Sequence, residues 1–583
     1  MKNRAIPVPP AGFGRPRNRR AARTAALFLL LLCCLLLKTP AAQAAKTVYP
    51  PIWLECGEGD AAQRVILWEY GSNVTFFLPA GFDTEHMRLL YYSPINAVTV
   101  DGKDYQSGDP LALSSLAGEH KIKYRRASFS LRVMVSENLP AMFLTTESGS
   151  LQKINANKHY KESGAIRLFD ENGALLLSDG LEHVKGRGNS SFLQPKRPYQ
   201  IKFSTRTSLF GMPKAKKWVL LANHKDESLI RNSILFESAR RLKEKYPNDD
   251  QYIDLYINCQ YMGTYELCQK VEIDENRISV FDLQEATEAL NDLPLDSYKR
   301  FGSSQYKKGT AKGFKIPNDP EDITGGYLLD LEKPFHYPEN PNGLVTKRGI
   351  SFIVKSPEYM SEKQAAYISA AVQRLEDAIY AKDGRDPETG RHFTELADLD
   401  SMVREYLLEE VFKNYDVNKS SQFIVKPSDA EGGKFYFGPT WDFDLSMGMW
   451  CDGPKNNTIV SPKRLLAASG SGWLPSLCKH QVFMERVYSM YYEELLPYLR
   501  ALTGLEPDGE TVTLSEREDT LKASAAMNFT RWPVLAAPWP VQTGTTFDEN
   551  YTYLNNWLVK RMDYLDSIWK SKYDALNAKR EGT

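Results

Sequence analysis

Apolar and polar positions alternate in short runs over roughly the first hundred residues after residue 45. Runs such as RVILWEY, NVTFFLPA and HKIKYRR are rich in β-branched and aromatic residues, and Gly, Asn, Asp and Ser turns separate them. Turn signals at intervals of about 8–12 residues are typical of a small antiparallel sandwich. We therefore predict a β-sandwich-like module over residues 45–138.

The pattern changes in residues 139–283 to strands arranged around one helix. AIRLFD, YQIKF and WVLLAN read as strands, whereas residues 226–242 carry apolar side chains at helical spacing, with Asp226 placed to cap the helix. YIDLYINCQYMGTYELCQKVEID then alternates on both sides of a glycine-containing bend, which predicts a hairpin.

The remaining chain mixes strands and helices. Residues 284–322 are polar and predict a surface insertion, and residues 323–477 predict strands with helices at 360–382 and 397–414. Residues 478–583 read as helical, with a polar loop at 531–549. The expected fold class is α+β.

The N-terminus has the pattern of an export signal. RPRNRRAARTAA is basic and free of acidic residues, Leu27–Leu37 is an apolar run, and Ala42-Gln43-Ala44 offers a small-x-small cleavage site. We expect residues 1–44 to be a signal peptide and the mature protein to be secreted or on the cell surface, without a membrane span. An uncleaved N-terminal anchor is the alternative.

Charge and cysteine content narrow the classes of partner. Lysine plus arginine and aspartate plus glutamate are each 73, so a net charge of zero gives no reason to expect nucleic acid as a partner. Five cysteines follow the signal, at positions 56, 259, 268, 451 and 478. Their scatter excludes a disulfide framework and a metal-ligand motif. One bridge between Cys259 and Cys268 across the hairpin is one reading, and buried free thiols are the other.

Two aspartates interrupt the apolar stretch FYFGPTWDFDLSMG. On an extended strand Asp442 and Asp444 would share a face, where burial and mutual repulsion call for a cation between them. Asp416 precedes them in a loop after a predicted helix. A loop carboxylate followed by a hairpin and a metal-type carboxylate is the order found in protein-kinase-like phosphotransferases, where Mg²⁺ takes carboxylate and phosphate oxygens. Turn aspartates with solvated side chains are the simpler reading of the pair alone.

A second candidate lies upstream, in KGRGNSSFLQPKRPYQIKF. Its glycines flank Arg187, and a strand carrying Lys202 follows, so backbone N–H groups and cationic side chains could meet an anion there. Arg231 and Glu237 on the next helix could pair with Lys202 or be solvated helix charges.

The order of these motifs resembles the spore coat protein H (CotH-type) kinase family, secreted or surface proteins with a divergent protein-kinase-like fold. The resemblance covers roughly residues 139–450. The segments that carry it are RGNSSF, KRPYQIKF, WVLLANHKDESLIRNSILFE, YINCQYMGTYELCQKVEID, GGYLLDLE, FIVKSPE, YDVNKSSQFIV and GPTWDFDLSMG.

The resemblance implies a kinase-like N-lobe over residues 139–283, a C-lobe core over 323–477, and roles for individual residues. It makes Asp416 the catalytic aspartate and Asp442 a Mg²⁺ ligand supported by Asp444, with ATP as cosubstrate and Mn²⁺ as an alternative metal. The implied nucleotide-binding residues are Arg187, Gly188, Asn189, Ser190, Lys202 and Arg231, with Asn232 beside Arg231 aligning the site.

Two positions depart from the family pattern. Ser421 stands where the family commonly has a metal-binding asparagine, and a hydroxyl is a poorer Mg²⁺ ligand than an amide carbonyl. Gln269 stands where a glutamate is common, although Glu272 lies nearby.

We consider three functions for these residues. The first is an exported kinase that phosphorylates a protein Ser or Thr hydroxyl. The second is a catalytically weak or inactive kinase-shaped scaffold or adhesin at the cell surface, with the β module contacting a partner or a glycan. The third, a metal-assisted hydrolase, is disfavoured because only eight histidines are present, without ligand spacing, and no Gly-x-Ser-x-Gly motif occurs.

Overall fold

The computed structural model describes residues 52–92, 95–113, 115–450, 459–535, 537, 541 and 543–581. The predicted signal peptide and Cys451 lie outside these ranges. Within them, no helix has both the length and the apolar character needed to cross a bilayer.

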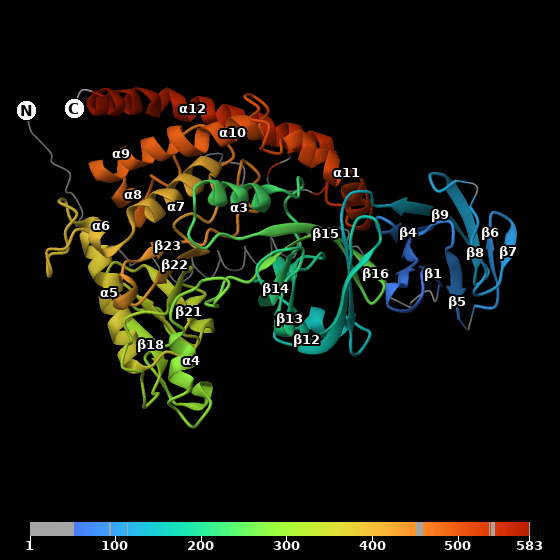
Figure 1. Ribbon diagram of the computed structural model, residues 1–583, viewed down its shortest axis with the longest axis horizontal. Helices are drawn as coiled ribbons and strands as arrows, with labels where there is room; N and C mark the ends of the chain where they lie inside the picture. Colours follow the sequence, from blue (N-terminus) through green and yellow to red (C-terminus); the bar gives the residue numbers. More distant parts are fainter. Residues whose placement is uncertain are drawn as a thin grey trace, which may run out of the picture. The chain divides into compact units, whose positions relative to one another are not determined.

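The N-terminal region consists of two sheets on a shared core (Figure 1). One has the order β2-β1-β5 and the other the order β3-β4-β9-β8-β6-β7. Leu54 and Leu89 of the first sheet and Phe76 and Leu131 of the second meet in this core, which is the packing of a sandwich. The strands are β1 (Ile52–Cys56), β2 (Gln63–Ile66), β3 (Trp68–Tyr70), β4 (Asn73–Leu78), β5 (Arg88–Tyr91), β6 (Val98–Val100), β7 (Lys103–Tyr105), β8 (Glu119–Tyr124) and β9 (Ala127–Val135).

A closed barrel follows, in the order β10-β11-β12-β13-β14-β16-β15. Parallel pairing of β10 with β15 closes it, and alternate residues such as Ile201, Trp218 and Leu255 fill its interior. Its elements are β10 (Ala141–Thr146), α2 (Gln152–Ala156), β11 (Lys161–Phe169), β12 (Leu175–Gly186), β13 (Tyr199–Thr207), β14 (Ala215–Leu221), α3 (Arg231–Arg241), β15 (Asp250–Ile257) and β16 (Gln260–Gln269).

The helix predicted from residue 226 begins five residues later, at Arg231. Residues 226–230 instead form a turn in which the Asp226 carboxylate accepts hydrogen bonds from the backbone N–H groups of Ser228 and Arg231. Asp226 therefore serves the N-terminus of α3 without being its N-cap residue. Local side-chain hydrogen bonds of this kind compete with helix geometry.

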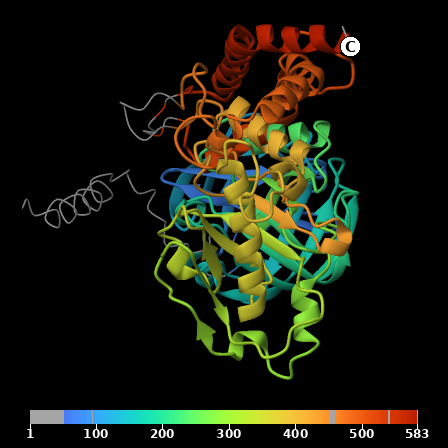
Figure 2. The same cartoon turned by 90° about the vertical axis from the view of Figure 1, so that its left-hand side faces the viewer.

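A seven-stranded sheet in the order β17-β18-β20-β21-β19-β22-β23 and its helices form the rest of the protein (Figure 2). Residues 284–322, expected as a surface insertion, contribute β17 and β18 to this sheet. The strands are β17 (Arg300–Phe301), β18 (Thr310–Phe314), β19 (Tyr327–Leu331), β20 (Gly343–Val345), β21 (Ser351–Ser356), β22 (Gln422–Lys426) and β23 (Tyr436–Phe437). The helices before the C-terminal region are α4 (Leu283–Glu288), α5 (Glu362–Tyr380), α6 (Phe393–Leu396), α7 (Leu399–Phe412) and α8 (Trp473–Leu477).

The helices predicted at 360–382 and 397–414 are confirmed as α5 and α7. A capping box between Ser361 and Gln364 starts α5, and the Asp398 carboxylate caps α7.

The C-terminal helices share a hydrophobic core with this sheet. They are α9 (Gln481–Met490), a π turn (Tyr491–Leu495), α10 (Leu496–Leu502), α11 (Leu514–Arg531) and α12 (Phe547–Glu581). Leu554, Trp557 and Leu558 of α12 pack in the cluster that holds α7 and β19, and α11 contacts β16 of the barrel. The helical C-terminal region predicted from the sequence is therefore part of the main body rather than an appendage.

The predicted bridge between Cys259 and Cys268 is wrong, and the alternative of free thiols is confirmed. Cys259 lies in the turn before β16, whereas Cys268 lies near the far end of that strand. Nine residues of extended strand separate their Cα atoms by about 30 Å, and a disulfide requires less than about 7 Å.

Candidate active site

The three aspartates singled out in the sequence converge. Asp416 lies in the turn after α7, and Asp442 and Asp444 lie in the loop after β23. Burial, followed by the charge of Asp416, raises the pKa of Asp442. Burial, followed by the charge of Asp442, raises the pKa of Asp444 to about 8. The carboxylates are thus close enough to disfavour one another's ionised forms, which is the situation that a bound cation relieves.

The backbone that brings Asp442 and Asp444 together is a loop, not the extended strand that their spacing suggested. Strand β23 ends at Phe437, and Asp442 has a left-handed backbone with φ of 70°. A non-glycine residue held in that conformation is uncommon outside tight turns and functional sites. The expectation of an extended strand was wrong because a spacing of two residues between side chains fits a turn as well as a strand.

Helix α3 holds this loop in place through buried polar contacts. The Asn232 Oδ1 atom accepts a hydrogen bond from the Phe443 backbone N–H (2.8 Å), and the Arg231 Nε atom donates to the Ser446 carbonyl (3.0 Å). The Arg231 guanidinium also forms a buried ion pair with Asp226. Arg231 therefore positions the aspartate loop, and its Nε and Nη1 atoms are engaged by protein groups. Asn232, to which the resemblance gave the role of aligning the site, contacts the backbone of the same loop.

The proposed pairing of α3 with Lys202 is not found. Glu237 pairs with Arg517 and with Arg241, and Arg231 pairs with Asp226. Arg517 lies far from Glu237 in sequence, Arg241 lies on the same helix as Glu237, and Asp226 lies in the turn just before α3.

Two lysines that the sequence analysis did not single out face the aspartates. The Lys333 Nζ atom lies 2.6 Å from Asp416 Oδ1. Lys225, in the turn before α3, has its Nζ atom 4.2 Å from the centre of the Trp450 ring. Burial lowers the pKa of Lys225, and the charges of Asp444, Asp416 and Asp442 oppose that shift. Lys225 lies within WVLLANHKDESLIRNSILFE, one of the segments that carry the family resemblance. That position was the signal in the sequence that could have pointed to Lys225 as a site residue.

The glycine-containing turn predicted to bind phosphate reaches the same place through Arg187. Its guanidinium lies 5.5 Å from the centre of the Trp441 ring. Burial lowers its pKa, and the charge of Asp442 opposes that shift. Gly188 has φ of +87°, and a Cβ there would lie 2.2 Å from the Ser191 hydroxyl, so this turn requires glycine.

The other residues of the turn and Lys202 make different contacts. The Asn189 side chain accepts a hydrogen bond from Lys158 (2.9 Å), and Ser190 precedes the short helical turn Ser191–Leu193. Lys202 lies on β13, and its Nζ atom contacts Glu182 at 2.6 Å. The Lys202 ammonium is therefore engaged by Glu182 and not by the three aspartates.

A cluster of lysines lies on the outer face of the barrel. Lys217 and Lys270 flank Glu272, with Nζ to Oε2 distances of 2.6 and 3.2 Å. Burial, followed by the charge of Lys270, lowers the pKa of Lys185. Lys355 of β21 is close enough to contribute to the lowered pKa of Lys270. Four ammonium groups around one carboxylate leave an excess of positive charge.

Asp330 connects the lysine cluster with the aspartates. Its Oδ2 atom lies 3.7 Å from the Lys355 Nζ atom. Burial raises the pKa of Asp330 to about 7, and the charge of Asp442 contributes to that rise. The site thus contains a cationic part on the barrel next to an anionic part on the loops, which suits a ligand that carries phosphates and a divalent ion.

The two departures from the family pattern have structural consequences. Ser421 donates a hydrogen bond from Oγ to Asp442 Oδ2 (3.0 Å), so it supports the predicted metal ligand. Gln269 donates to the Pro213 carbonyl, whereas Glu272 takes the position between the lysines. A glutamate that orients lysines is therefore present, three residues from the expected position.

Within the described ranges, no three His, Cys, Asp or Glu side chains are grouped as a ready metal site. Mg²⁺ is commonly held by one or two carboxylates together with phosphate oxygens and water. The mutually repelling Asp442 and Asp444 carboxylates fit that mode, in which the ion arrives with the nucleotide.

The fold and site define a mixed α and β protein, with several sheets, a helical C-terminal region and a half-buried site of three aspartates faced by lysines. The family model described as "CotH kinase protein" matches residues 184–565, about two thirds of the chain, including all three aspartates. The chain therefore belongs to the CotH kinase protein family. No curated protein matches the sequence.

Proposed function

We propose that the protein is an exported phosphotransferase that moves the γ-phosphate of ATP to a Ser or Thr hydroxyl of a protein. The convergence of Asp416, Asp442 and Asp444 opposite Lys225 and Lys333 carries the proposal. Phosphoryl transfer needs positioned reactants and neutralised charge more than covalent help from the protein. Membership of the CotH kinase family supports the same class of reaction.

Each charged residue has a task in this proposal. Asp416 orients the acceptor hydroxyl and accepts its proton, and Lys333 holds the Asp416 carboxylate in place. Asp442 and Asp444 are the oxygen ligands for Mg²⁺, with Mn²⁺ as an alternative, and Ser421 orients Asp442. The divalent ion supplies neutralisation of the phosphate charge when it is bound.

The lysine cluster and Arg187 are the proposed phosphate-binding surface. Lys185 lies on β12, Arg187 lies in the turn directly after β12, and Lys270 directly follows β16. Burial lowers the pKa of all three side chains. These side chains are half-buried, so they have already lost part of their hydration, and their attraction to a phosphate is stronger than it would be on an open surface.

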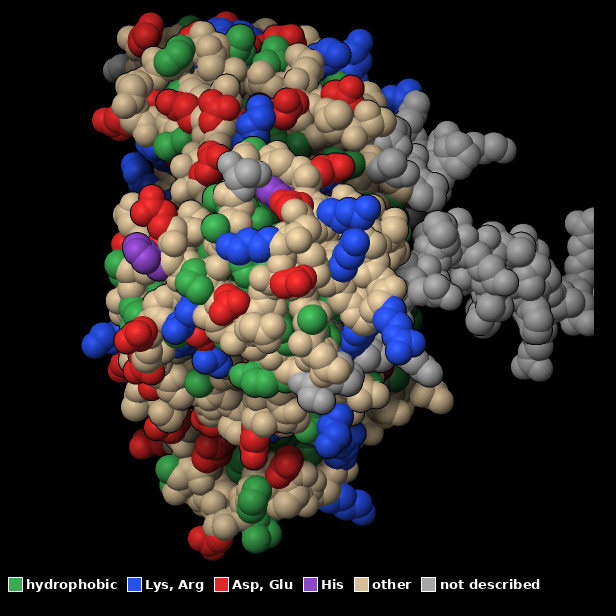
Figure 3. All heavy atoms as spheres, turned by 90° about the vertical axis from the view of Figure 1, so that its right-hand side faces the viewer, with side chains coloured by type: hydrophobic (Ala, Val, Ile, Leu, Met, Phe, Trp, Pro, Cys, Tyr) green, Lys and Arg blue, Asp and Glu red, His purple; other side chains and the backbone are tan. Residues whose placement is uncertain are grey.

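A catalytically weak surface scaffold is the second candidate, because Ser421 replaces the amide expected at the metal. Export and a cell-surface location belong to both proposals and rest on the N-terminal sequence. The scaffold candidate includes contact of the β module with a partner or a glycan. Figure 3, which views the side where β5–β9 lie in Figure 1, shows acidic and basic side chains interspersed and hydrophobic ones scattered.

Binding of ATP with Mg²⁺ is expected to raise the melting temperature of the full chain. A ligand at a hundred times its Kd stabilises the native state by about 2.7 kcal/mol. Differential scanning fluorimetry with millimolar ATP measures the shift, which EDTA should remove. Asp442→Asn should abolish it, whereas Asp563→Asn, an exposed change on α12, should not. An identical melting temperature with and without Mg²⁺ and ATP favours the scaffold.

Replacing Lys333 by methionine is expected to slow transfer without unfolding the protein. A hydrogen bond to a charged group contributes about 1.5–3 kcal/mol, and each 1.36 kcal/mol of barrier is tenfold in rate, so the expected loss is about 10- to 100-fold. Initial rates of phosphate incorporation from labelled ATP measure it. Lys419→Met is the control, because Lys419 lies on the turn that carries Asp416 but donates a hydrogen bond to the Tyr415 carbonyl. Equal rates for both variants would remove Lys333 from the mechanism.

A further inference from the structure

Lys225 faces the three aspartates but has no task in the mechanism above. Its Nζ atom lies 4.2 Å from the centre of the Trp450 ring. That ring packs edge-on against the ring of Tyr415, the residue directly before Asp416, with 6.5 Å between the two ring centres. These contacts place the ammonium beside the turn that carries Asp416. Burial lowers the pKa of Lys225, and the charges of all three aspartates oppose that shift.

The turn that carries Lys225 is fixed to the aspartate loop. The Asp226 backbone N–H donates a hydrogen bond to the Asn223 carbonyl (3.2 Å), which closes the turn around Lys225. The Arg231 guanidinium binds the Asp226 carboxylate and also donates from Nε to the Ser446 carbonyl of the aspartate loop. Buried and satisfied hydrogen bonds of this kind hold the support of a functional side chain in place.

The Lys225 ammonium lies near the carboxylates without pairing with one. Among the residues that the structure describes, Lys225 forms no ion pair, whereas the Lys333 Nζ atom contacts Asp416 at 2.6 Å. A half-buried cation that stands apart from facing carboxylates leaves room for a group that both sides can bind. A phosphoryl group fits this requirement, because its oxygens bind an ammonium on one side and a carboxylate-held divalent ion on the other.

We propose that Lys225 is a catalytic residue that binds the oxygens of the phosphoryl group during its transfer. The inference rests on the phosphotransferase function proposed above. The acceptor oxygen forms a bond to the γ-phosphorus while the bond from that phosphorus to the β–γ bridging oxygen breaks, and ADP leaves with the electron pair. The proton of the acceptor hydroxyl goes to Asp416. Lys225 keeps its own proton and neutralises negative charge on the oxygens of the transferred group.

Replacing Lys225 by methionine is expected to lower kcat for phosphate transfer about 100-fold or more, because one preorganised donor to the transition state contributes about 10²- to 10³-fold. Lys225→Arg keeps the positive charge and should stay within about tenfold of the unchanged protein. Initial rates of phosphate incorporation from labelled ATP into casein measure both variants.

A second measurement needs no acceptor protein. ADP with Mg²⁺ and aluminium fluoride mimics the group in transfer, and analogues of a transition state bind more tightly than ground-state ligands. In the unchanged protein, adding aluminium fluoride to Mg²⁺ and ADP should raise the melting temperature further. Lys225→Met should keep the shift that Mg²⁺ and ADP give, because ADP lacks the transferred group, and should lose the further rise. A lysine with a merely structural role would change both shifts or neither.

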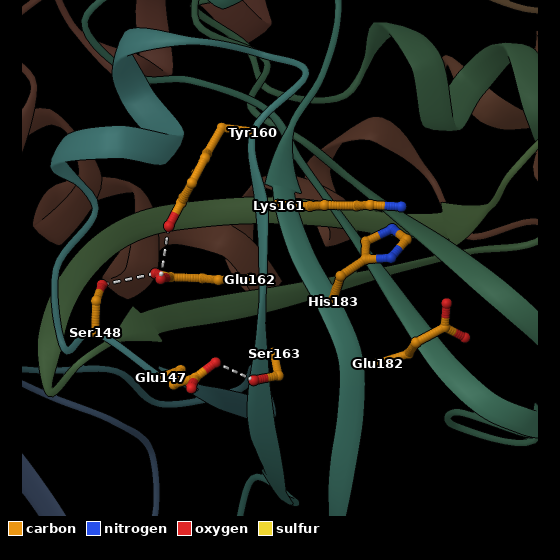
Figure 4. Close-up of a pocket in the computed structure, with 8 residues that line it drawn as sticks. All are labelled: Glu147, Ser148, Tyr160, Lys161, Glu162, Ser163, Glu182 and His183. Atoms are coloured by element: carbon orange, nitrogen blue, oxygen red, sulfur yellow. Dashed lines mark hydrogen bonds between the residues drawn. The ribbon is translucent and has the colours of Figure 1, made fainter.

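The matched control is Lys161→Met. Lys161 also forms no ion pair with a described residue, but its ammonium lies beside His183 on the wall of a hollow of about 620 Å³ on the barrel (Figure 4). The ammonium there has no part in the proposed transfer. This variant should keep the rise with aluminium fluoride and a transfer rate within about threefold of the unchanged protein.

The outcomes separate this inference from the proposed function. Loss of the aluminium fluoride rise in Lys225→Met but not in Lys161→Met, together with the lowered transfer rate, supports the role of Lys225. A rise that survives in Lys225→Met, an unchanged transfer rate, or the same loss in Lys161→Met overturns that role and leaves the phosphotransferase in place. An unchanged protein that neither transfers phosphate nor responds to aluminium fluoride contradicts the proposed function, and the role of Lys225 fails with it.

Discussion

Replacing Asp416 by asparagine is expected to abolish measurable phosphate transfer while the protein stays folded. An amide is isosteric with the carboxylate but cannot accept the proton of the acceptor hydroxyl. Loss of a positioned general base lowers rates by about 10²- to 10⁴-fold. The charge of Asp416 also disfavours ionisation of Asp442, so its removal should not destabilise the site. Transfer of labelled phosphate to a protein acceptor measures the effect, and ATP-dependent melting checks that nucleotide still binds.

The matched control is Asp429→Asn. Asp429 also forms a lysine–aspartate ion pair, with Lys426 at 3.0 Å, but on a different loop from the three aspartates. Its variant should keep its transfer rate. If the Asp416 variant transfers phosphate at a rate within about threefold of that of the unchanged protein, the general-base role is wrong. Loss of a general base would raise the barrier by more than such a rate change represents.

Local patterns were sufficient to predict most elements of the fold. Period-two runs predicted the N-terminal strands, and apolar spacing with capping residues predicted α5 and α7. The start of α3 was misplaced because the Asp226 side chain builds a turn that resembles a helix cap in sequence. The barrel was not predicted, since its closure depends on the parallel pairing of β10 with β15, which lie more than a hundred residues apart.

The candidate site shows the same division between local and long-range information. Asp416, Asp442 and Asp444 carry recognisable spacing, whereas Lys333, Lys270 and Lys355 are ordinary surface-type lysines in the sequence. These lysines come close together only because the outer face of the barrel packs near β19 and β21. The family resemblance points to Lys202, on the strand that follows the glycine turn, whereas the lysines near Asp330 come from other segments.

The largest expected effect on stability is that of Arg561→Met, far from the aspartates. Arg561 of α12 is fully buried, and its guanidinium donates to Glu410 Oε1 (2.7 Å) and to the carbonyls of Glu410 (2.7 Å) and Val411 (3.3 Å). These carbonyls belong to the last turn of α7 and have no partner within that helix. Removing the arginine leaves the buried Glu410 carboxylate without its ion-pair partner, held only by the backbone N–H groups of Leu466 and Ala468. Loss of one partner of a buried ion pair costs about 3–5 kcal/mol. Urea unfolding monitored by circular dichroism measures the loss.

Two further variants separate the buried charge from ordinary loss of packing. Arg561→Met/Glu410→Gln should recover part of the stability, because no unpaired charge then remains in the core. Arg580→Met on the same helix removes a largely exposed pair with Glu493 and should change stability by less than about 1 kcal/mol. Equal losses for Arg561 and Arg580 would contradict the assignment. Because α7 ends four residues before Asp416, the Arg561 variant should also lose transfer activity at temperatures well below its unfolding. That result would make α12 a support of the catalytic turn rather than a separate tail.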